Sequence, residues 1–164
     1  MIEGELEHKD SMGNGRVIKA GDLQYISAGR GVLHSEVNPS PDRPVHFLQI
    51  WLKPNLNGGE PRYAEKALGQ AKPNSSTLLF AGEPREGAVG IRADADIYFG
   101  KLEAGKRLTH SSGAGRAQWL HVIAGNLTVA GEALKPGDGL AVENAVALEL
   151  ESQENSEFLL FDLK

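Results

Sequence analysis

The residues of this chain best suited to chemistry are His34 and Glu36, in the segment 29–37 (GRGVLHSEV). Side chains two apart on a strand point the same way, because successive residues alternate between its two faces. An imidazole and a carboxylate on one face are typical ligands of a first-row divalent metal ion. Such an ion needs at least three protein ligands. Since no other histidine or glutamate lies at an obvious partner spacing, the sequence predicts half of a metal site.

Short runs of alternating apolar and polar residues extend along the chain and are typical of β-strands. In the segment 2–8 (IEGELEH), the glutamates share one face, while Ile2, Leu6 and His8 share the other. Similar runs occupy residues 23–28, 45–52, 77–81, 97–102, 119–123, 145–150 and 158–163. Segments rich in Gly, Pro, Asn and Asp separate them. At most two turns of helix are indicated, at residues 61–68, so the sequence predicts an all-β fold.

A weak internal repeat divides the chain further. Each copy has a strand, a glycine turn, a second strand and a Gly-Asp turn into a third. Gly4 and Gly21 mark the first copy, and Gly125 and Gly137 mark the second. The repeat predicts two small β-sandwich domains of the same kind.

Charge and composition exclude several classes of protein. The 164 residues carry a formal net charge of -5, which disfavours direct binding to nucleic acid or to an anionic membrane. The absence of cysteine excludes disulfides, thiolate ligands and cysteine nucleophiles. The first residues lack the pattern of a signal peptide, and no apolar run is long enough to cross a bilayer. We therefore expect a cytoplasmic protein without a nucleic-acid or membrane partner.

Several segments resemble the pirin family of bicupins, specifically its bacterial quercetinase-like branch. They are residues 3–14 (EGELEHKDSMGN), 27–39 (SAGRGVLHSEVNP), 46–51 (HFLQIW), 61–63 (PRY) and 158–162 (FLLFD). The resemblance runs along the whole chain. It is most specific in the N-terminal third and is mainly a matter of pattern in the second half.

The resemblance implies two cupin β-barrels packed face to face, with one metal ion, usually Fe(II), in the N-terminal barrel. It also implies three histidine ligands and one glutamate ligand, of which the last two match His34 and Glu36. The first two histidines form a His-x-His motif on strands that precede the hairpin at which this chain begins. We accordingly expect a truncated protein, with a partial N-terminal cupin barrel at residues 1–56, a connecting segment at 57–76, and a C-terminal cupin barrel without metal at 77–164.

The activity implied by the resemblance is that of quercetin 2,3-dioxygenase, a metal-dependent oxidoreductase that acts on flavonols. His34 would anchor the metal, and Glu36 would bind it and accept the proton of a substrate hydroxyl. Because two of the four ligands are absent, we expect impaired activity.

The other histidines have weaker claims to a role. His8 faces the same way as Leu6 and could replace a missing ligand, although the family has no ligand at this hairpin position. We expect His8 and His46 to support the ligands or to line the pocket. His110 lies where a cupin would place its first motif but lacks a second histidine, and His121 is expected to be an ordinary strand residue.

Three interpretations stay open. The chain could be an inactive pirin-family protein. It could instead be a working dioxygenase whose missing strands or ligands come from a partner, for example in a homodimer formed by strand exchange. The third is a non-catalytic binding or regulatory module that acts through protein partners.

Overall fold

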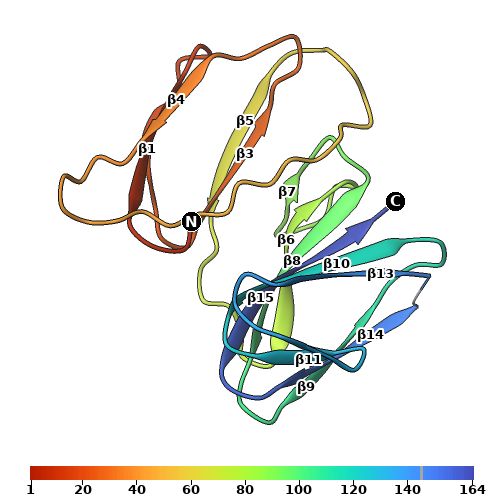
Figure 1. The fold of residues 1–164 in the computed structure, drawn as a ribbon. Helices are drawn as coiled ribbons and strands as arrows, with labels where there is room; N and C mark the ends of the chain where they lie inside the picture. The colour runs from red at the N-terminus through yellow and green to blue at the C-terminus, as the bar shows by residue number, and fades with distance from the viewer. Residues whose placement is uncertain (145) are drawn as a thin grey trace. The chain divides into compact units, whose positions relative to one another are not determined.

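The computed structural model describes residues 1–144 and 146–164, and these residues form strands, turns and loops without a helix. The chain forms two compact units. Unit 1 comprises Met1–Gly69 and Ile91–Ala93, and unit 2 comprises Gln70–Gly90 and Asp94–Lys164. Figure 1 labels the strands of both units except β2 and β12. The predicted all-β fold is confirmed. The described part of the chain also contains no helix able to cross a membrane.

Unit 1 is built from two small antiparallel sheets. One has the strand order β2-β1-β4, and the other pairs β3 with β5. The strands are β1 (Glu5–Asp10), β2 (Gly15–Lys19), β3 (Asp22–Ser27), β4 (His34–Val37) and β5 (Arg62–Ala67). Leu6 on β1 lies opposite Ile18 on β2, and both are buried. His8 shares the face of Leu6, so β1 directs one histidine toward the interior, as its alternation predicts.

The approach to β4 depends on a glycine. Gly29 has φ +55°, and a Cβ at this position would contact the carbonyl oxygen of Gly59 and lie 2.8 Å from backbone atoms of Glu60 and Pro61. Arg30 N donates to the same Gly59 oxygen at 2.9 Å. The segment before β4 therefore packs backbone to backbone against the segment before β5. Such a close approach requires a residue without a side chain.

Several expected elements differ in the structure. Residues 45–52 do not form the expected strand, since His46 makes just an isolated bridge with Glu3. The helix considered at residues 61–68 is wrong, because β5 occupies this segment and pairs with β3. The strand β5 also lies inside the expected connecting segment 57–76, while the unit boundary follows Gly69. The domain boundaries at 56 and 76 stay a prediction.

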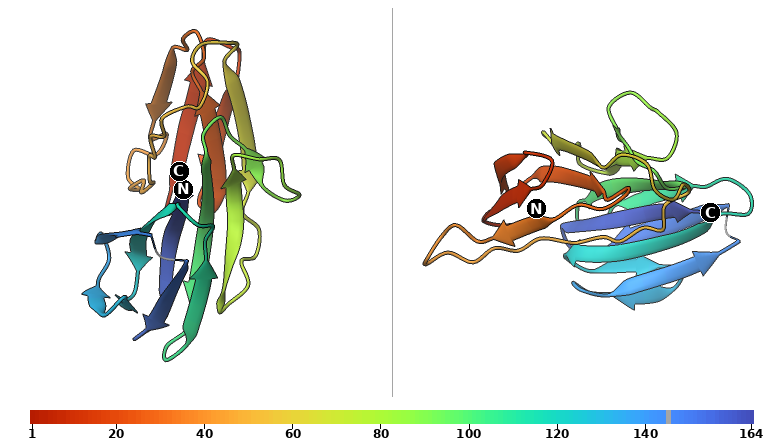
Figure 2. Two further views of the ribbon diagram at one scale, coloured as in Figure 1. Left: turned by 90° about the vertical axis from the view of Figure 1, so that its right-hand side faces the viewer. Right: turned by 90° about the horizontal axis from the view of Figure 1, so that it is seen from above.

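Unit 2 consists of a six-stranded sheet with the order β13-β10-β15-β8-β6-β7 and a four-stranded sheet with the order β12-β11-β14-β9. The views of Figure 2 show these sheets as layers. The strands are β6 (Ser75–Ala81), β7 (Val89–Gly90), β8 (Ala95–Leu102), β9 (Arg107–Ser111), β10 (Ala117–Ala124), β11 (Leu127–Val129), β12 (Glu132–Leu134), β13 (Gly139–Glu143), β14 (Ala147–Ser152) and β15 (Ser156–Leu163). Of the strand predicted at 145–150, residue 145 lies outside the described residues, and β14 covers most of the rest.

The core of unit 2 lies between its sheets, because inward-facing side chains of both meet there. The six-stranded sheet contributes Leu120, Val122 and Phe158, and the four-stranded sheet contributes Leu127 and Leu150, each at most 1% exposed. Leu120, Val122 and Leu150 are apolar positions of the predicted alternating runs. Leu127 lies outside those runs, and Phe158 begins a stretch of four consecutive buried apolar residues, so local alternation accounts for only part of the core.

Candidate metal centre

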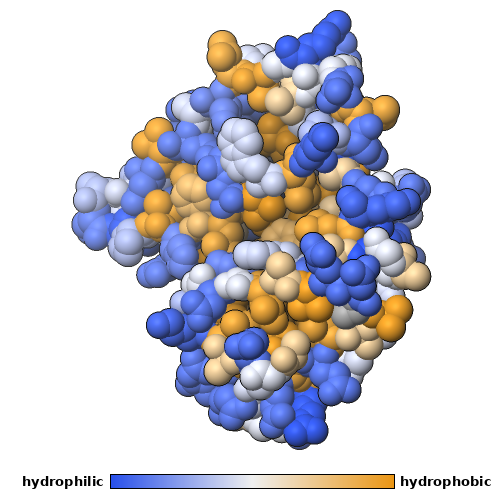
Figure 3. All heavy atoms as spheres, turned by 45° about the vertical axis from the view of Figure 1, so that its right-hand side comes forward, coloured by the Kyte–Doolittle hydropathy of each residue, from blue (hydrophilic) through white to orange (hydrophobic). Residues whose placement is uncertain are grey.

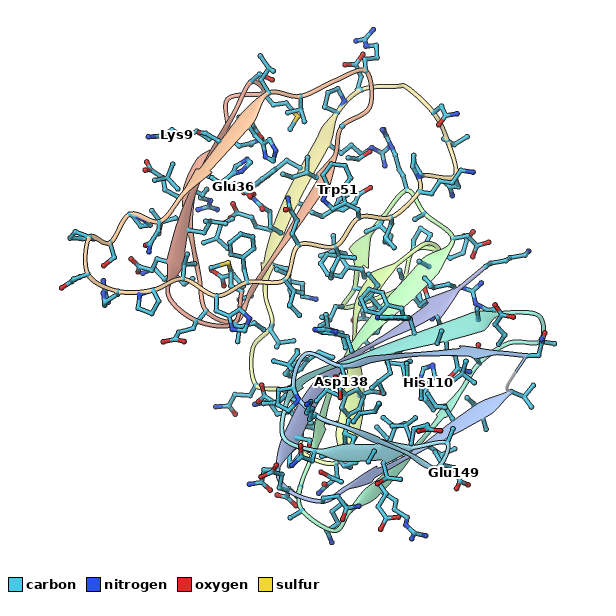
Figure 4. The ribbon with its side chains drawn as sticks, in the orientation of Figure 1. Lys9, Glu36, Trp51, His110, Asp138 and Glu149 are labelled. Atoms are coloured by element: carbon cyan, nitrogen blue, oxygen red, sulfur yellow. The ribbon has the colours of Figure 1, made fainter. Side chains whose placement is uncertain are left out.

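The pairing of β1 with β4 brings four polar side chains together. His8 lies directly opposite Glu36. In the same antiparallel register, Asp10 lies directly opposite His34. Because opposed residues share a face and residues two apart on each strand do so too, the four side chains form one block. In Figure 4, Glu36 is directed toward β3 and β5, whereas Lys9 points away.

Three members of this block form a cluster of possible metal ligands. One ligand atom from each of His8, His34 and Glu36 lies within 4.8 Å of the others. Glu36 Oε1 is 3.8 Å from His8 Nδ1 and 4.0 Å from His34 Nδ1. Within residues 1–144 and 146–164, no other group of three or more His, Asp or Glu side chains converges in this way. The alternation of the sequence places His34 and Glu36 on one face, and the structure brings them together with His8, for which the sequence left open a role as a substitute ligand or as a residue beside the ligands.

Burial of the cluster decreases from one end to the other. The side chain of His8 is 0% exposed, that of Glu36 is 18% exposed, and that of His34 is 36% exposed. A small molecule can therefore approach from the His34 side, while His8 closes the inner end. His46, expected beside the site, is an exposed residue whose backbone pairs with Glu3. It does not belong to the ligand cluster.

The residues present fit a divalent cation. His8 Nδ1 is buried and has no hydrogen-bond partner among the described residues, which is costly for a polar atom. It faces a carboxylate oxygen beyond hydrogen-bond distance. Two imidazole nitrogens with one carboxylate oxygen suit Fe, Ni, Mn or Zn. A cation at this place would satisfy the buried nitrogen and the carboxylate together.

A fourth residue, Asp10, supports the buried end of the cluster. Its Oδ2 accepts hydrogen bonds from Asn14 Nδ2 at 2.7 Å and from His8 Nε2 at 3.2 Å. Its Oδ1 accepts from the backbone N–H groups of Met12 at 2.9 Å and Asn14 at 3.0 Å. Desolvation acts to raise the pKa of Asp10, but these hydrogen bonds outweigh it and lower the pKa to about 2. Asp10 is thus an ionised acceptor at neutral pH.

Tyr63 on β5 covers the other side of His8. The two rings are stacked, with centroids 5.0 Å apart and an interplanar angle of 21°. The Tyr63 hydroxyl donates to Glu65 and accepts from Gln24 Nε2 at 3.3 Å. Desolvation and the bond to Glu65 raise the pKa of Tyr63 to about 12. Glu65 in turn pairs with Arg16 Nε at 3.0 Å. The sequence assigned Tyr63 no role, and the signal that could have found it is the strand pairing of β5.

The histidines of unit 2 lie in other surroundings. His110 is buried on β9, edge-on to the Tyr98 ring at 4.7 Å, with its Nε2 4.0 Å from Asp162 Oδ2. Burial lowers the pKa of His110, against the opposing effect of Asp162 and Asp96. Neither His110 nor His121 belongs to a cluster of three or more possible ligands in the described part of the chain.

Comparison with known families gives two matches. Residues 1–52 match the family described as Pirin, and residues 78–163 match the Quercetinase C-terminal cupin domain. Quercetin 2,3-dioxygenase of Escherichia coli K12 is 36% identical over 163 residues, which cover 99% of this chain and 70% of that relative. The pirin-like protein of Caulobacter vibrioides is 32% identical, covering 98% of this chain and 69% of its own.

Solved structures agree with these matches. The crystal structure of YhhW from Escherichia coli has a TM-score of 0.95 at 36% identity, covering 99% of this chain and 69% of that chain. A second YhhW structure, described as a bacterial pirin in complex with nickel(II), has a TM-score of 0.93 with the same identity and coverage. The cupin fold implied by the sequence resemblance is therefore confirmed. Identity of this level along nearly the whole chain, in a fold that follows YhhW so closely, has one explanation: this chain belongs to the pirin family.

Proposed function

We propose that this protein is a metal-dependent dioxygenase of the quercetinase type, which acts on flavonols at the cluster of His8, His34 and Glu36. The observation that carries the proposal is the convergence of these three side chains within 4.8 Å. It is supported by relatives, since the Escherichia coli relative is called quercetin 2,3-dioxygenase and YhhW is described in complex with nickel(II).

A divalent ion held by His8, His34 and Glu36 would supply Lewis-acid activation of the hydroxyl and carbonyl oxygens of a flavonol. Glu36 has two carboxylate oxygens, so one can face the ion while the other accepts the proton of the substrate hydroxyl. The half-exposed His34 marks the side from which a flat aromatic substrate enters. The stacked rings of His8 and Tyr63 close the opposite side and limit access of water.

We further propose Fe(II) as the working metal. The donor set of two imidazoles and one carboxylate is the set used by non-haem Fe(II) oxygenases, which leave positions open for other molecules. Affinity alone favours later metals such as Ni(II), so the metal has to be identified by activity and not by retention. Parallel loading with Fe(II), Ni(II) and Mn(II) tests this point. The highest turnover with Fe(II) supports it, and equal or higher turnover with another metal contradicts it.

The activity is tested with anaerobically Fe(II)-loaded protein, mixed with quercetin and air-saturated buffer. We expect loss of quercetin absorbance together with an equal consumption of dioxygen. Glu36→Gln removes both the carboxylate ligand and the proton acceptor, so turnover falls by at least about 100-fold. Glu7→Gln is the matched control, because Glu7 lies next to His8 on the other face of β1 and pairs with Lys9. Absence of turnover in metal-loaded wild-type protein would refute the activity.

A second candidate function is non-catalytic binding of protein partners. Leu33, Leu56 and Trp51 in unit 1 are 81%, 70% and 87% exposed, and Figure 3 shows apolar side chains on the surface among polar ones. The first partner to test is a second copy of this chain, since β4 is an edge strand. A dimer in light scattering that Leu33→Ser with Trp51→Ser abolishes would favour this function. A monomer at all concentrations would argue against a second copy of this chain as the binding partner.

A further inference from the structure

We propose that His8 binds the metal through Nδ1 and that Asp10 is the positioning residue that makes this nitrogen available. The inference rests on the metal site of the proposed function and adds to it the nitrogen through which His8 binds and the positioning role of Asp10. It concerns which histidine nitrogen carries the proton, and therefore which one can bind a cation.

Hydrogen bonding around Asp10 determines the tautomer of His8. All the other partners of this carboxylate are donors: the side-chain amide of Asn14 and the backbone N–H groups of Met12 and Asn14. An ionised carboxylate can only accept, so the His8 Nε2 atom at 3.2 Å must carry a proton and donate it. In a neutral imidazole, Nδ1 then keeps its lone pair.

The free lone pair points to the ligand cluster. His8 Nδ1 is buried, lacks a hydrogen-bond partner among the described residues and lies 3.8 Å from Glu36 Oε1. Two acceptors that face each other at this distance repel, unless something positive lies between them. Neighbouring ligands of an ion with bonds of about 2.1 Å are about 3.0–3.5 Å apart, so a contraction of about half an ångström would bring His8 Nδ1 and Glu36 Oε1 to the spacing of two ligands of one ion.

The arrangement has the form of a carboxylate–histidine–metal triad. In such triads the outer carboxylate orients the imidazole and increases its basicity, and its loss typically costs about 10–100-fold in metal affinity. Asp10 is itself immobilised by the β1–β2 hairpin, and the His8 ring is fixed between Asp10 and Tyr63. His8 is therefore pre-oriented, whereas His34 at the open end is the more exposed of the two histidines.

Substitution of Asp10 by asparagine tests the tautomer directly. In Asp10→Asn, the side-chain oxygen can keep the bonds to Met12 N and Asn14 N, but an NH₂ group replaces the oxygen that faces His8. This group donates to Nε2, so the proton moves to Nδ1 and blocks it. We expect the affinity for Zn(II) to fall by at least about 10-fold. Asn14→Ala is the matched control: it removes the other donor to Oδ2 but leaves the contact with His8, so affinity stays within about twofold.

The decisive measurement is ¹⁵N NMR of histidine-labelled protein during titration with Zn(II), which reports the protonated nitrogen of His8. Calorimetry of the same titration gives the affinity for Zn(II). We expect metal-free wild-type His8 to be protonated at Nε2, and Zn(II) to shift the Nδ1 resonance of His8. His8→Ala should lower the affinity for Zn(II) at least as much as Asp10→Asn does. A proton on Nδ1, an unshifted Nδ1 on saturation with Zn(II), or undiminished affinity in folded Asp10→Asn would each overturn the inference. The wild-type spectrum decides the matter even if a variant does not fold.

The outcome is separable from that of the proposed function. Zn(II) bound through His8 without flavonol turnover in the Fe(II) form would support this inference and refute the dioxygenase activity. Turnover in His8→Ala with undiminished metal content would support the activity and overturn the role of His8.

Discussion

The contact between Gly100 and Phe158 should couple two strands of unit 2 strongly. These residues are directly opposite on β8 and β15, and Phe158 is fully buried. A Cβ at position 100 would overlap the Phe158 ring, and the nearest atoms to it all belong to that ring. Gly100→Ala alone therefore forces overpacking, which costs about 1–3 kcal/mol. Phe158→Ala alone removes a buried ring and leaves a cavity, at a cost of about 3–5 kcal/mol.

Together the two substitutions should cost less than their sum. Once the ring is absent, the methyl group at position 100 meets no obstacle and fills part of the cavity, worth about 0.8 kcal/mol. The double variant should then be about 2–4 kcal/mol more stable than additivity predicts. Leu134→Ala, in the other sheet, is the control partner and should add to Gly100→Ala without coupling.

Urea unfolding followed by Trp119 fluorescence measures this cycle, in a Trp51→Phe background that leaves one tryptophan in the chain. The midpoints should shift while the slopes stay constant, because the same surface is exposed on unfolding. Additive costs for Gly100→Ala and Phe158→Ala would refute the proposed packing of the ring on the glycine.

Three further predictions concern charge, the site wall and the metal. Because burial lowers the pKa of His110 below its ordinary value of 6.5, the unfolded chain takes up a proton first as the pH falls. The free energy of unfolding should therefore decrease as the pH falls from about 6.5 through the pKa of His110 in the folded protein. Urea unfolding at pH 7.5 and pH 5 should show a smaller dependence on pH in His110→Gln than in the wild type, and an equal dependence would contradict the prediction. Tyr63→Phe loses the hydrogen bonds to Glu65 and Gln24 but keeps the ring stacked on His8. In calorimetry, the free energy of unfolding should therefore fall by about 1 kcal/mol, while the affinity for Zn(II) should stay within about twofold of the wild-type value. Zn(II) at a free concentration of 100 times its Kd should stabilise the protein by about 2.7 kcal/mol, and a chelator should remove this stabilisation. Thermal unfolding with and without the chelator measures the difference, which His34→Ala should abolish.

Much of the site follows from local pattern. The alternation along residues 34–37 predicts that His34 and Glu36 share a face, and β4 has this geometry. The same reasoning at residues 2–8 directs His8 inward with Leu6, and both are buried. The pattern could not show that His8 meets Glu36, since this depends on β1 and β4 pairing in one particular register. A shift of that register by one residue would turn His8 to the other face.

The sequence by itself therefore determined the fold class, the turn positions and the side chains that share a face of each strand. These properties depend on φ/ψ preferences and on the period of two, which act over a few neighbouring residues. Tertiary structure decided that residues 62–67 form β5 and not a helix, since the pairing with β3 supplies their hydrogen bonds. It also decided that Asp10, His8, Glu36 and His34 form one cluster, because strand register depends on residues distant in the chain and has no local signal.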